Sequence, residues 1–302
     1  MARNASKLYY PIKESILSIL PIVDEFVIAL GKGDEDDDTH ELLASIDSPK
    51  IKIIDTVWDI TEFPNGMENA HQTDIAKSAC TGDWLFYLQA DELVHEKYHQ
   101  LILKRCDQYL DDKRVEAFLF GYKHFWGDYH HYHKSYGWYT DEIRIVRNDP
   151  EIHSWRSAQS FRKIPDFDGR SYRQKENTKK LQVIKLEAEV YHYGWVRPPK
   201  LMQSKRKSLD IIHKGEKGID KHWEDIFHYG DLKNLTKFTE THPLVMTEFV
   251  SKMNWEEELN EPGRNGRKKH KHERFKYRFL TFLLKIFPFI PLGSKNWFLL
   301  KS

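Results

Sequence analysis

The sequence predicts an α/β protein in which helices flank a mostly parallel sheet. Three apolar strand patterns, residues 24–30, 50–56 and 83–89, are separated by segments with helical spacing. Strands that alternate with helices in this way are typical of parallel sheets, because the chain returns to the same edge through each crossover helix. A chain of 302 residues is long enough for one large α/β domain with a helical annex.

The elements follow from local signals. Pro11 fits the first turn of a helix, and apolar residues then recur on one face of residues 10–20. Thr39 is a candidate N-cap for the next helix, and Asn65-Gly66 marks a turn before the third. The helices expected over the chain are residues 10–20, 41–46, 71–80, 96–110 and 200–213. The later strands expected are residues 117–122, 142–146, 183–186 and 189–193.

These elements divide the chain into two regions. Residues 1–200 are expected to form the main domain, with a nucleotide-binding part over 1–95 and an acceptor part over 115–200. Residues 201–302 are expected to form a helical annex that ends in a basic and aromatic tail. Many aromatic side chains and histidines lie between residues 122 and 155, a composition that suits core packing and also sugar binding, since sugar C–H faces stack on rings.

Composition narrows the class of protein. Lys and Arg number 47 against 46 for Asp and Glu, whereas proteins that bind nucleic acid are usually more basic. Two cysteines make a disulfide framework or a cysteine-based zinc site implausible. Residues 1–10 lack the apolar core of a secretory signal, and the apolar stretch 279–292 is too short to span a bilayer. We therefore expect a cytoplasmic protein without a nucleic-acid partner.

Two acidic segments follow strands of the predicted sheet. In open α/β sheets, ligands bind beyond the carboxyl ends of the strands. The loop over residues 31–39 follows the first strand, and it is so acidic that a purely structural role would leave its carboxylates repelling one another. Gln89-Ala90-Asp91-Glu92 follows the third strand. Asp91 and Glu92 could hold Mg²⁺ or Mn²⁺ across a diphosphate, or they could be two solvated acids of a surface turn.

Two further features have competing interpretations. His192 alternates with aromatic residues on an expected strand, so it could be a third metal ligand, a diphosphate contact, or a core histidine bonded to a carbonyl. The basic run 264–278 could face solvent, an anionic lipid surface, an acidic glycan or nucleic acid. The aromatic residues within and beside that run favour a membrane surface slightly.

The order and spacing of several segments resemble family 2 glycosyltransferases, which have the GT-A fold. The early segments are Arg3-Asn4 with Tyr10-Pro11, residues 24–27, Asp37 with Thr39, residues 66–76 with 82–84, and Gln89 to Glu92 in the place of the family's D-x-D motif. The later ones, residues 144–148, 154–162, 191–199 and 241–246, resemble a bacterial subgroup that assembles cell-surface polysaccharide or lipopolysaccharide.

The resemblance implies inverting transfer of a sugar from a nucleotide-sugar to a glycan or glycolipid acceptor, assisted by a divalent metal. The implied catalytic base is Asp141 or Glu142, although this pair could instead be ion-paired with Arg144 or Arg147. The implied metal ligands are Asp91, Glu92 and His192. The implied donor contacts are Arg3, Gly31, Asp37, Asp55, Gln89 and Trp195. The implied location is the cytoplasm, with peripheral contact at the inner face of the membrane through the C-terminal tail.

The sequence departs from the family pattern at two places. Gln89 stands where the first Asp of D-x-D is expected, which weakens the metal assignment. The family also begins with an apolar strand directly before the Arg-Asn pair, whereas only Met1-Ala2 precede Arg3. The natural start is therefore expected to lie further upstream. If the chain does start at Met1, its stability and its affinity for nucleotide are expected to be reduced.

Other functions remain open from the sequence. Both departures suit a non-catalytic relative that keeps the fold for binding or as a scaffold. A nucleotidyltransferase would need a Gly- and Lys-rich phosphate loop near the start, which the sequence lacks. Nucleic-acid binding through the basic tail would show a steep salt dependence, and the near-neutral net charge argues against it.

Overall fold

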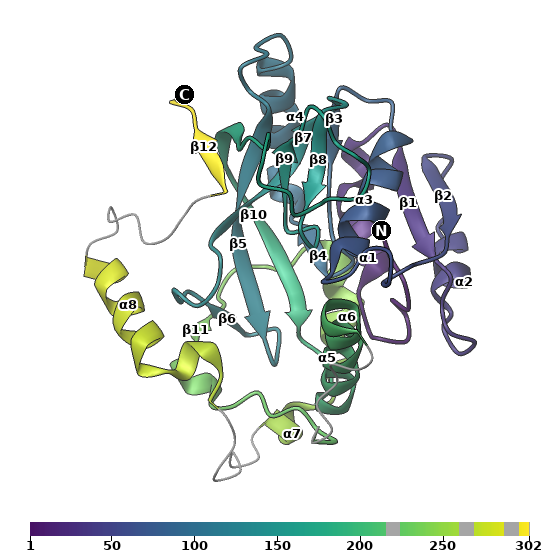
Figure 1. Cartoon of the computed structure of the whole chain (residues 1–302). Helices are drawn as coiled ribbons and strands as arrows, with labels where there is room; N and C mark the ends of the chain where they lie inside the picture. The colour runs from purple at the N-terminus through teal and green to yellow at the C-terminus, as the bar shows by residue number, and fades with distance from the viewer. Residues whose placement is uncertain (216–223, 260–268, 287–295, 302) are drawn as a thin grey trace.

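The structure is a computed structural model of the chain, and it describes residues 1–215, 224–259, 269–286 and 296–301 (Figure 1). Part of the basic run, residues 264–268, and part of the apolar stretch, residues 287–292, lie outside the described residues. The described part is α/β, as the sequence predicts.

The N-terminal part forms a small parallel sheet with helices around it. Strands β1 (Phe26–Gly31) and β2 (Ile51–Thr56) pair in parallel along their whole length. The surrounding helices are α1 (Ile12–Ile19), α2 (Thr39–Ala44) and α3 (Met67–Ser78). Ala2 forms a parallel bridge with Leu30 on the side of β1 opposite to β2. These elements confirm the expected alternation of helices and strands in this region.

The larger sheet has eight strands among the described residues, and its centre is the parallel pair of β5 (Ala117–Trp126) and β10 (Leu181–Trp195). The other six are β3 (Trp84–Phe86), β4 (Glu92–Val94), β6 (His131–His133), β7 (Asp141–Arg147), β11 (Thr236–Lys237) and β12 (Trp297–Leu299). A separate hairpin joins β8 (Ile152–Trp155) and β9 (Ser160–Lys163).

The expectation of a mostly parallel sheet is not confirmed. Among the described strand pairs, β1–β2, β5–β10 and β10–β12 are parallel, whereas the six others are antiparallel. The physical reason is connectivity, since β5 turns back directly into β6 and β7 without the crossover helix that a parallel pair requires.

The C-terminal region contributes both helices and strands. Its helices are α5 (Pro199–Lys214), α6 (Thr247–Ser251), α7 (Glu256–Leu259) and α8 (Phe275–Ile286), and α4 (His99–Gln108) lies earlier in the chain. Short 3₁₀ turns cover Leu20–Ile22, Glu96–Tyr98, Leu232–Asn234, Leu244–Met246 and Lys271–Glu273. Strands β11 and β12 extend the larger sheet, and Trp255 is buried in the core, so residues beyond 201 also complete the main domain.

The core lies on the two faces of β5, β7 and β10, most of whose side chains are buried. The aromatic segment 122–155 is largely part of this core, since Trp126, Tyr129 and Tyr132 are buried rather than displayed on an open loop. In the residues that the structure describes, no helix has both the length and the apolar character needed to cross a bilayer.

Candidate functional site

A cavity of about 440 Å³ lies at the carboxyl ends of β1 and β2. Three residues that the sequence assigns to the nucleotide-sugar, Gly31, Asp37 and Asp55, line it together. Gly31 ends β1, and Asp55 lies beside Leu30 near the end of β2. This is the edge at which ligands bind in open α/β sheets.

Gly31 allows a tryptophan to lie against the backbone at this edge. A Cβ atom added to Gly31 would lie 2.3 Å from Nε1 of Trp58, so no larger residue fits without moving the indole. Among the described residues, the buried indole N–H of Trp58 has no hydrogen-bond acceptor. A buried donor without an acceptor is costly, and a ligand oxygen at this edge could accept its hydrogen bond.

The acidic loop is neutralised by the N-terminal segment rather than left with unpaired charges. Lys7 Nζ lies 2.8 Å from Asp34 Oδ2 and 2.6 Å from Asp36 Oδ1. Arg3 donates from Nε to the carbonyl of Lys32 at 3.0 Å, and its Nη2 lies 3.7 Å from Asp34 Oδ1. The expected repulsion within the loop is therefore largely offset.

Asp37 is held by two hydrogen bonds to one oxygen of its carboxylate. Its Oδ1 accepts hydrogen bonds from the backbone N–H of Lys7 at 3.1 Å and from the hydroxyl of Thr39 at 2.7 Å. A Cβ atom on Gly33 would lie 2.6 Å from Oδ2 of Asp37. Asp37 thus fixes the loop that forms one wall of the cavity.

A second cluster surrounds Asp91, which is 5% exposed. Lys205, from α5, donates to Asp91 Oδ2 at 2.8 Å and to the carbonyl of Gly194 at 2.7 Å. Burial alone would raise the pKa of Asp91, but the charges of Lys205, His192 and Arg197 hold it well below its ordinary value. Burial lowers the pKa of Lys205 to about 8, although Asp91 opposes the shift.

His192 faces the other oxygen of Asp91, because β10 lies antiparallel beside β4. His124 Nε2 lies 2.8 Å from the carbonyl of Tyr139 and must donate to it, so the neutral ring accepts at Nδ1. His192 Nδ1, 2.9 Å away, is then the donor, which leaves a lone pair on its Nε2. That Nε2 lies 3.7 Å from Asp91 Oδ1. Burial lowers the pKa of both imidazoles, to about 3 for His124 and about 4 for His192, so both are neutral at pH 7.

Asp91 and His192 therefore present two facing acceptor atoms that fit a shared cation. A Cβ atom on Gly194 would lie 2.5 Å from His192 Nε2 and 2.7 Å from Asp91 Oδ2, so glycine is required beside this pair. Two protein ligands suffice for Mg²⁺ or Mn²⁺ when substrate phosphates complete the coordination. No group of three or more His, Cys, Asp or Glu suited to a metal is present in the described part of the chain.

Glu92, the other expected metal ligand, forms a buried ion pair instead. Arg144 donates from Nε to Glu92 Oε2 at 2.7 Å and from Nη2 to Oε1 at 2.8 Å. The hydroxyl of Tyr122 also donates to Oε1 at 2.9 Å. Because Glu92 is fully buried and both of its oxygens are engaged, it is not open to a metal in this arrangement.

Arg197 adds a second cation near Asp91. Its side chain is fully buried, it donates to the carbonyl of Leu8, and its guanidinium lies 4.6 Å from the ring centre of Tyr10. Nε and Nη2 have no hydrogen-bond acceptor among the described residues. Buried donors of this kind are suited to an anionic ligand.

The two candidate bases have different environments. Asp141 Oδ1 lies 2.5 Å from Lys185 Nζ, so this carboxylate is ion-paired. Glu142 is 2% exposed, and burial raises its pKa to about 7, while Arg144 opposes the rise. Burial also raises the pKa of Tyr139 well above 10, and the charges of Glu92, Glu142 and Asp91 add to this.

Gln89 and Trp195 lie outside the lining of the cavity. Gln89 donates to the carbonyl of Ala158 at 3.2 Å, and Trp195 stacks on Trp126 with ring centres 4.9 Å apart. Sequence reasoning missed Gly194, Arg197 and Lys205. The first two lie in or next to the aromatic strand that holds His192, whereas Lys205 is one of several lysines on a helix and carries no signal of its own.

Comparison of the sequence with models of known protein families gave no match, and comparison with curated proteins gave none either.

Proposed function

We propose that this protein is a glycosyltransferase with a GT-A type arrangement, which moves a sugar from a nucleotide-sugar to a glycan or glycolipid acceptor with inversion. The observation that carries the proposal is the cavity at the carboxyl ends of β1 and β2, where Gly31, Asp37 and Asp55 lie together. A cavity of about 440 Å³ is within the usual range for a small-molecule site.

The donor would lie with its nucleoside in the cavity and its diphosphate toward Asp91. Residues 3–10 join these two places, since Lys7 contacts the acidic loop while Leu8 and Tyr10 contact Arg197. Arg197 and Lys205 would then hold the negative charge of the diphosphate, which grows as the sugar leaves. Asp91 and His192 would hold a divalent metal, which supplies further positive charge at the leaving group when bound.

Glu142 is the stronger candidate for the base that removes the acceptor proton. A general base works best when its pKa is close to the working pH, and burial places the pKa of Glu142 at about 7. Among the described residues its Oε2 has no hydrogen-bond donor, whereas Asp141 is held by Lys185.

A specific observation favours the alternative, a non-catalytic binding or scaffold protein. Glu92 is engaged by Arg144, Asp91 is engaged by Lys205, and Gln89 replaces a carboxylate. A protein that had lost catalysis would bind nucleotide-sugars without releasing nucleoside diphosphate. The two proposals are thus separated by turnover rather than by binding.

The proposed location is the cytoplasm, at the inner face of the membrane. Helix α8 exposes Phe275, Phe279, Phe282 and Ile286, whose spacing places them on one face. Lys276 and Arg278 lie on the same helix, and an aromatic face with adjacent cations is suited to an anionic lipid surface. Figure 1 shows α8 at the side of the molecule away from β1 and β2.

The test is a thermal-shift screen with UDP-, GDP-, CMP- and dTDP-sugars, each with Mn²⁺ or with EDTA. A donor at 100 times its Kd stabilises the folded state by about 2.7 kcal/mol, which raises the Tm by several degrees. We expect a shift with one nucleotide class that increases with Mn²⁺. Released nucleoside diphosphate, measured on the same donor with mixed glycan acceptors, distinguishes the enzyme from the binding protein.

Two variants test whether the effect of Mn²⁺ on the Tm arises at Asp91 and His192. Gly194→Ala places a methyl group between Asp91 and His192, and Asp91→Asn removes the charge, so both should abolish the increment due to Mn²⁺. Asp47→Asn, at an exposed acid outside the cavity, is the matched control and should behave as the wild type. No shift with any donor, or a Mn²⁺ increment that survives in both variants, would contradict the proposal.

A further inference from the structure

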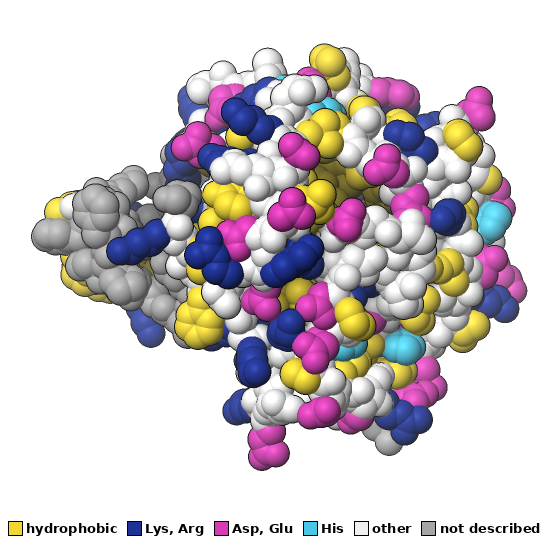
Figure 2. All heavy atoms as spheres, turned by 90° about the horizontal axis from the view of Figure 1, so that it is seen from above, with side chains coloured by type: hydrophobic (Ala, Val, Ile, Leu, Met, Phe, Trp, Pro, Cys, Tyr) yellow, Lys and Arg dark blue, Asp and Glu magenta, His cyan; other side chains and the backbone are white. Residues whose placement is uncertain are grey.

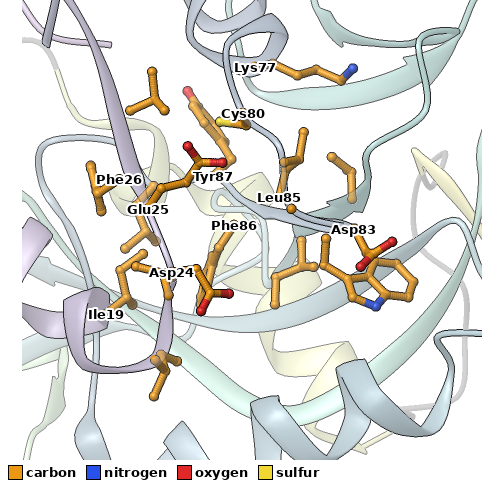
Figure 3. Close-up of a pocket in the computed structure, with 18 of the residues that line it drawn as sticks. Ile19, Asp24, Glu25, Phe26, Lys77, Cys80, Asp83, Leu85, Phe86 and Tyr87 are labelled. Atoms are coloured by element: carbon orange, nitrogen blue, oxygen red, sulfur yellow. The ribbon is translucent and has the colours of Figure 1, made fainter. Parts of the chain in front are cut away.

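A second cavity, of about 730 Å³, lies between β1 and β3 and is poorly suited to phosphate groups. Figure 3 shows Phe26 and Phe86 beside this space, together with Asp24, Glu25 and Asp83. Seen from above in Figure 2, the molecule has a hollow with a hydrophobic interior and acidic side chains around its mouth. The lysines that line the cavity are already bound, Lys50 to two carbonyls, Lys52 to Glu25 and Lys77 to a third carbonyl. Positive charge that a diphosphate could meet is gathered around Asp91 instead.

Two buried cations lie together beside Asp91. The Nζ atom of Lys205 lies 4.6 Å from the ring centre of Tyr10, and the guanidinium carbon of Arg197 lies 4.6 Å from the same ring centre. Lys205 donates to Asp91 Oδ2 and to the carbonyl of Gly194. Two nitrogens of Arg197 have no acceptor among the described residues. The cluster therefore holds more hydrogen-bond donors than acceptors.

The same cluster has positive charge in excess. The single carboxylate of Asp91 is faced by two cations, Lys205 and Arg197, and the imidazole beside it is neutral. The next charged groups, Glu92 and Arg144, form an ion pair and neutralise each other. A divalent metal added to this cluster would bring two more positive charges into a site that is almost closed to water.

The metal and Lys205 would share one carboxylate. The acceptor atoms that fit a metal are Oδ1 of Asp91 and Nε2 of His192, while Lys205 is bonded to Oδ2 of the same aspartate. Two cations within a few Å of each other repel strongly where water is excluded. The negative charges of a diphosphate would offset this repulsion, because its oxygens would accept from Lys205 and Arg197 and also supply ligands to the metal.

We propose that Lys205 makes the Asp91 cluster a joint site, in which a divalent metal binds only together with a diphosphate. Its ammonium group keeps the metal out while the site is empty, and it becomes a phosphate contact when the diphosphate arrives. The inference rests on the proposed function, because it takes the donor to carry a diphosphate. It further implies that the metal leaves together with the nucleoside diphosphate after transfer.

Equilibrium dialysis of the full chain with labelled Mn²⁺ and labelled inorganic pyrophosphate tests the proposal without sugar transfer. The wild type should retain little Mn²⁺ alone, and equal amounts of Mn²⁺ and pyrophosphate when both are present. Lys205→Gln keeps a hydrogen-bond donor beside Asp91 but removes the charge. It should bind Mn²⁺ alone more than about tenfold tighter than the wild type, since a repulsion of that size remains even with the screening of bulk water. Its affinity for pyrophosphate in EDTA should fall.

Lys207→Gln is the matched control, because it removes the same charge from an exposed position on the same helix and should behave as the wild type. The double variant of Asp91→Asn with Lys205→Gln should lose the gain, since the carboxylate of the metal site is gone. A gain of binding does not arise from misfolding, and thermal melts check that each variant is folded. The proposal is overturned if the wild type binds Mn²⁺ equally with and without pyrophosphate, if it retains Mn²⁺ in neither condition, or if Lys205→Gln gains no more than Lys207→Gln.

Sugar transfer is measured separately on the same proteins. Turnover of a nucleotide-sugar by a protein whose Lys205→Gln variant gains no Mn²⁺ would remove this role of Lys205 and leave the proposed function. Joint binding of Mn²⁺ and pyrophosphate that depends on Lys205, in a protein that binds no nucleotide-sugar, would leave the role of Lys205 and remove the proposed function.

Discussion

Replacing Arg144 by methionine would leave the carboxylate of Glu92 buried without its charge partner. Glu92 and Arg144 are both fully buried, and the substitution removes two charge-assisted hydrogen bonds of 2.7 and 2.8 Å. The hydroxyl of Tyr122 would still donate to Glu92, at 2.9 Å. A buried carboxylate with one remaining donor from a side chain has lost most of what compensates its desolvation.

Removing one partner of a buried ion pair costs about 3–5 kcal/mol. One kcal/mol lowers the Tm of a large domain by about 2–4 °C, so Arg144→Met should lower it by roughly 6–20 °C. The assay is urea denaturation followed by circular dichroism, together with a thermal melt at the same pH. Because the total stability of a domain is about 5–15 kcal/mol, the change would be a large fraction of it.

Two controls separate the buried charge from the loss of an arginine. Arg114→Met removes a surface pair with Asp112 of the same length, 2.7 Å, and should change the Tm far less than Arg144→Met does, because solvent screens the pair. The double variant Glu92→Gln with Arg144→Met removes both charges and should recover part of the loss. If Arg144→Met cost no more than Arg114→Met, the interpretation of Glu92 as a structural partner would be refuted.

Two further predictions follow from other side chains. Because the pKa of Glu142 is raised from 4.5 to about 7, mainly by burial, the folded state holds a proton that the unfolded state loses. The free energy of unfolding should therefore fall as pH rises from 4.5 through 7, by on the order of 3 kcal/mol relative to the Glu142→Gln variant. The measurement is urea denaturation of both proteins from pH 4 to 8. Parallel stability curves for the two proteins would exclude a raised pKa at Glu142. Replacing Phe279 and Phe282 by serine should reduce co-sedimentation with anionic vesicles about tenfold. The control is serine at Phe298, an exposed phenylalanine on β12, which should leave co-sedimentation unchanged. An equal loss in both variants would contradict a role for α8 at the membrane.

The first third of the fold was predictable because its signals are local. The apolar runs that become β1 and β2 and the Asn65-Gly66 turn before α3 lie within short windows of sequence, and the strands pair with near neighbours in the chain. The antiparallel order of the larger sheet was not predictable in this way. Strand β10 pairs with β4, β5 and β12, which lie up to about 120 residues away in sequence, so its register depends on tertiary packing.

The candidate site was predicted in part for the same reason. Asp91 and His192 were selected separately from sequence, and the β4–β10 register brings them to face each other. Glu92 was assigned the same role as Asp91, but adjacent residues at a strand end point to opposite sides, so Glu92 enters the core and meets Arg144. Lys205 could not be selected, because its reach to Asp91 depends on how α5 packs on β10.

The segment formed by residues 3–7 has a consequence for how the protein would respond to damage at its N-terminus. Ala2 is hydrogen-bonded to β1. The residues directly after it bind the acidic loop: Asn4 accepts a hydrogen bond from Asp34 N at 2.8 Å, and Lys7 forms an ion pair with Asp34. Fraying of Ala2 from β1 would therefore release the loop that forms one wall of the cavity proposed to bind the nucleotide. A change that makes the N-terminus more sensitive to protease should therefore weaken the proposed affinity for nucleotide, because the same local opening controls both.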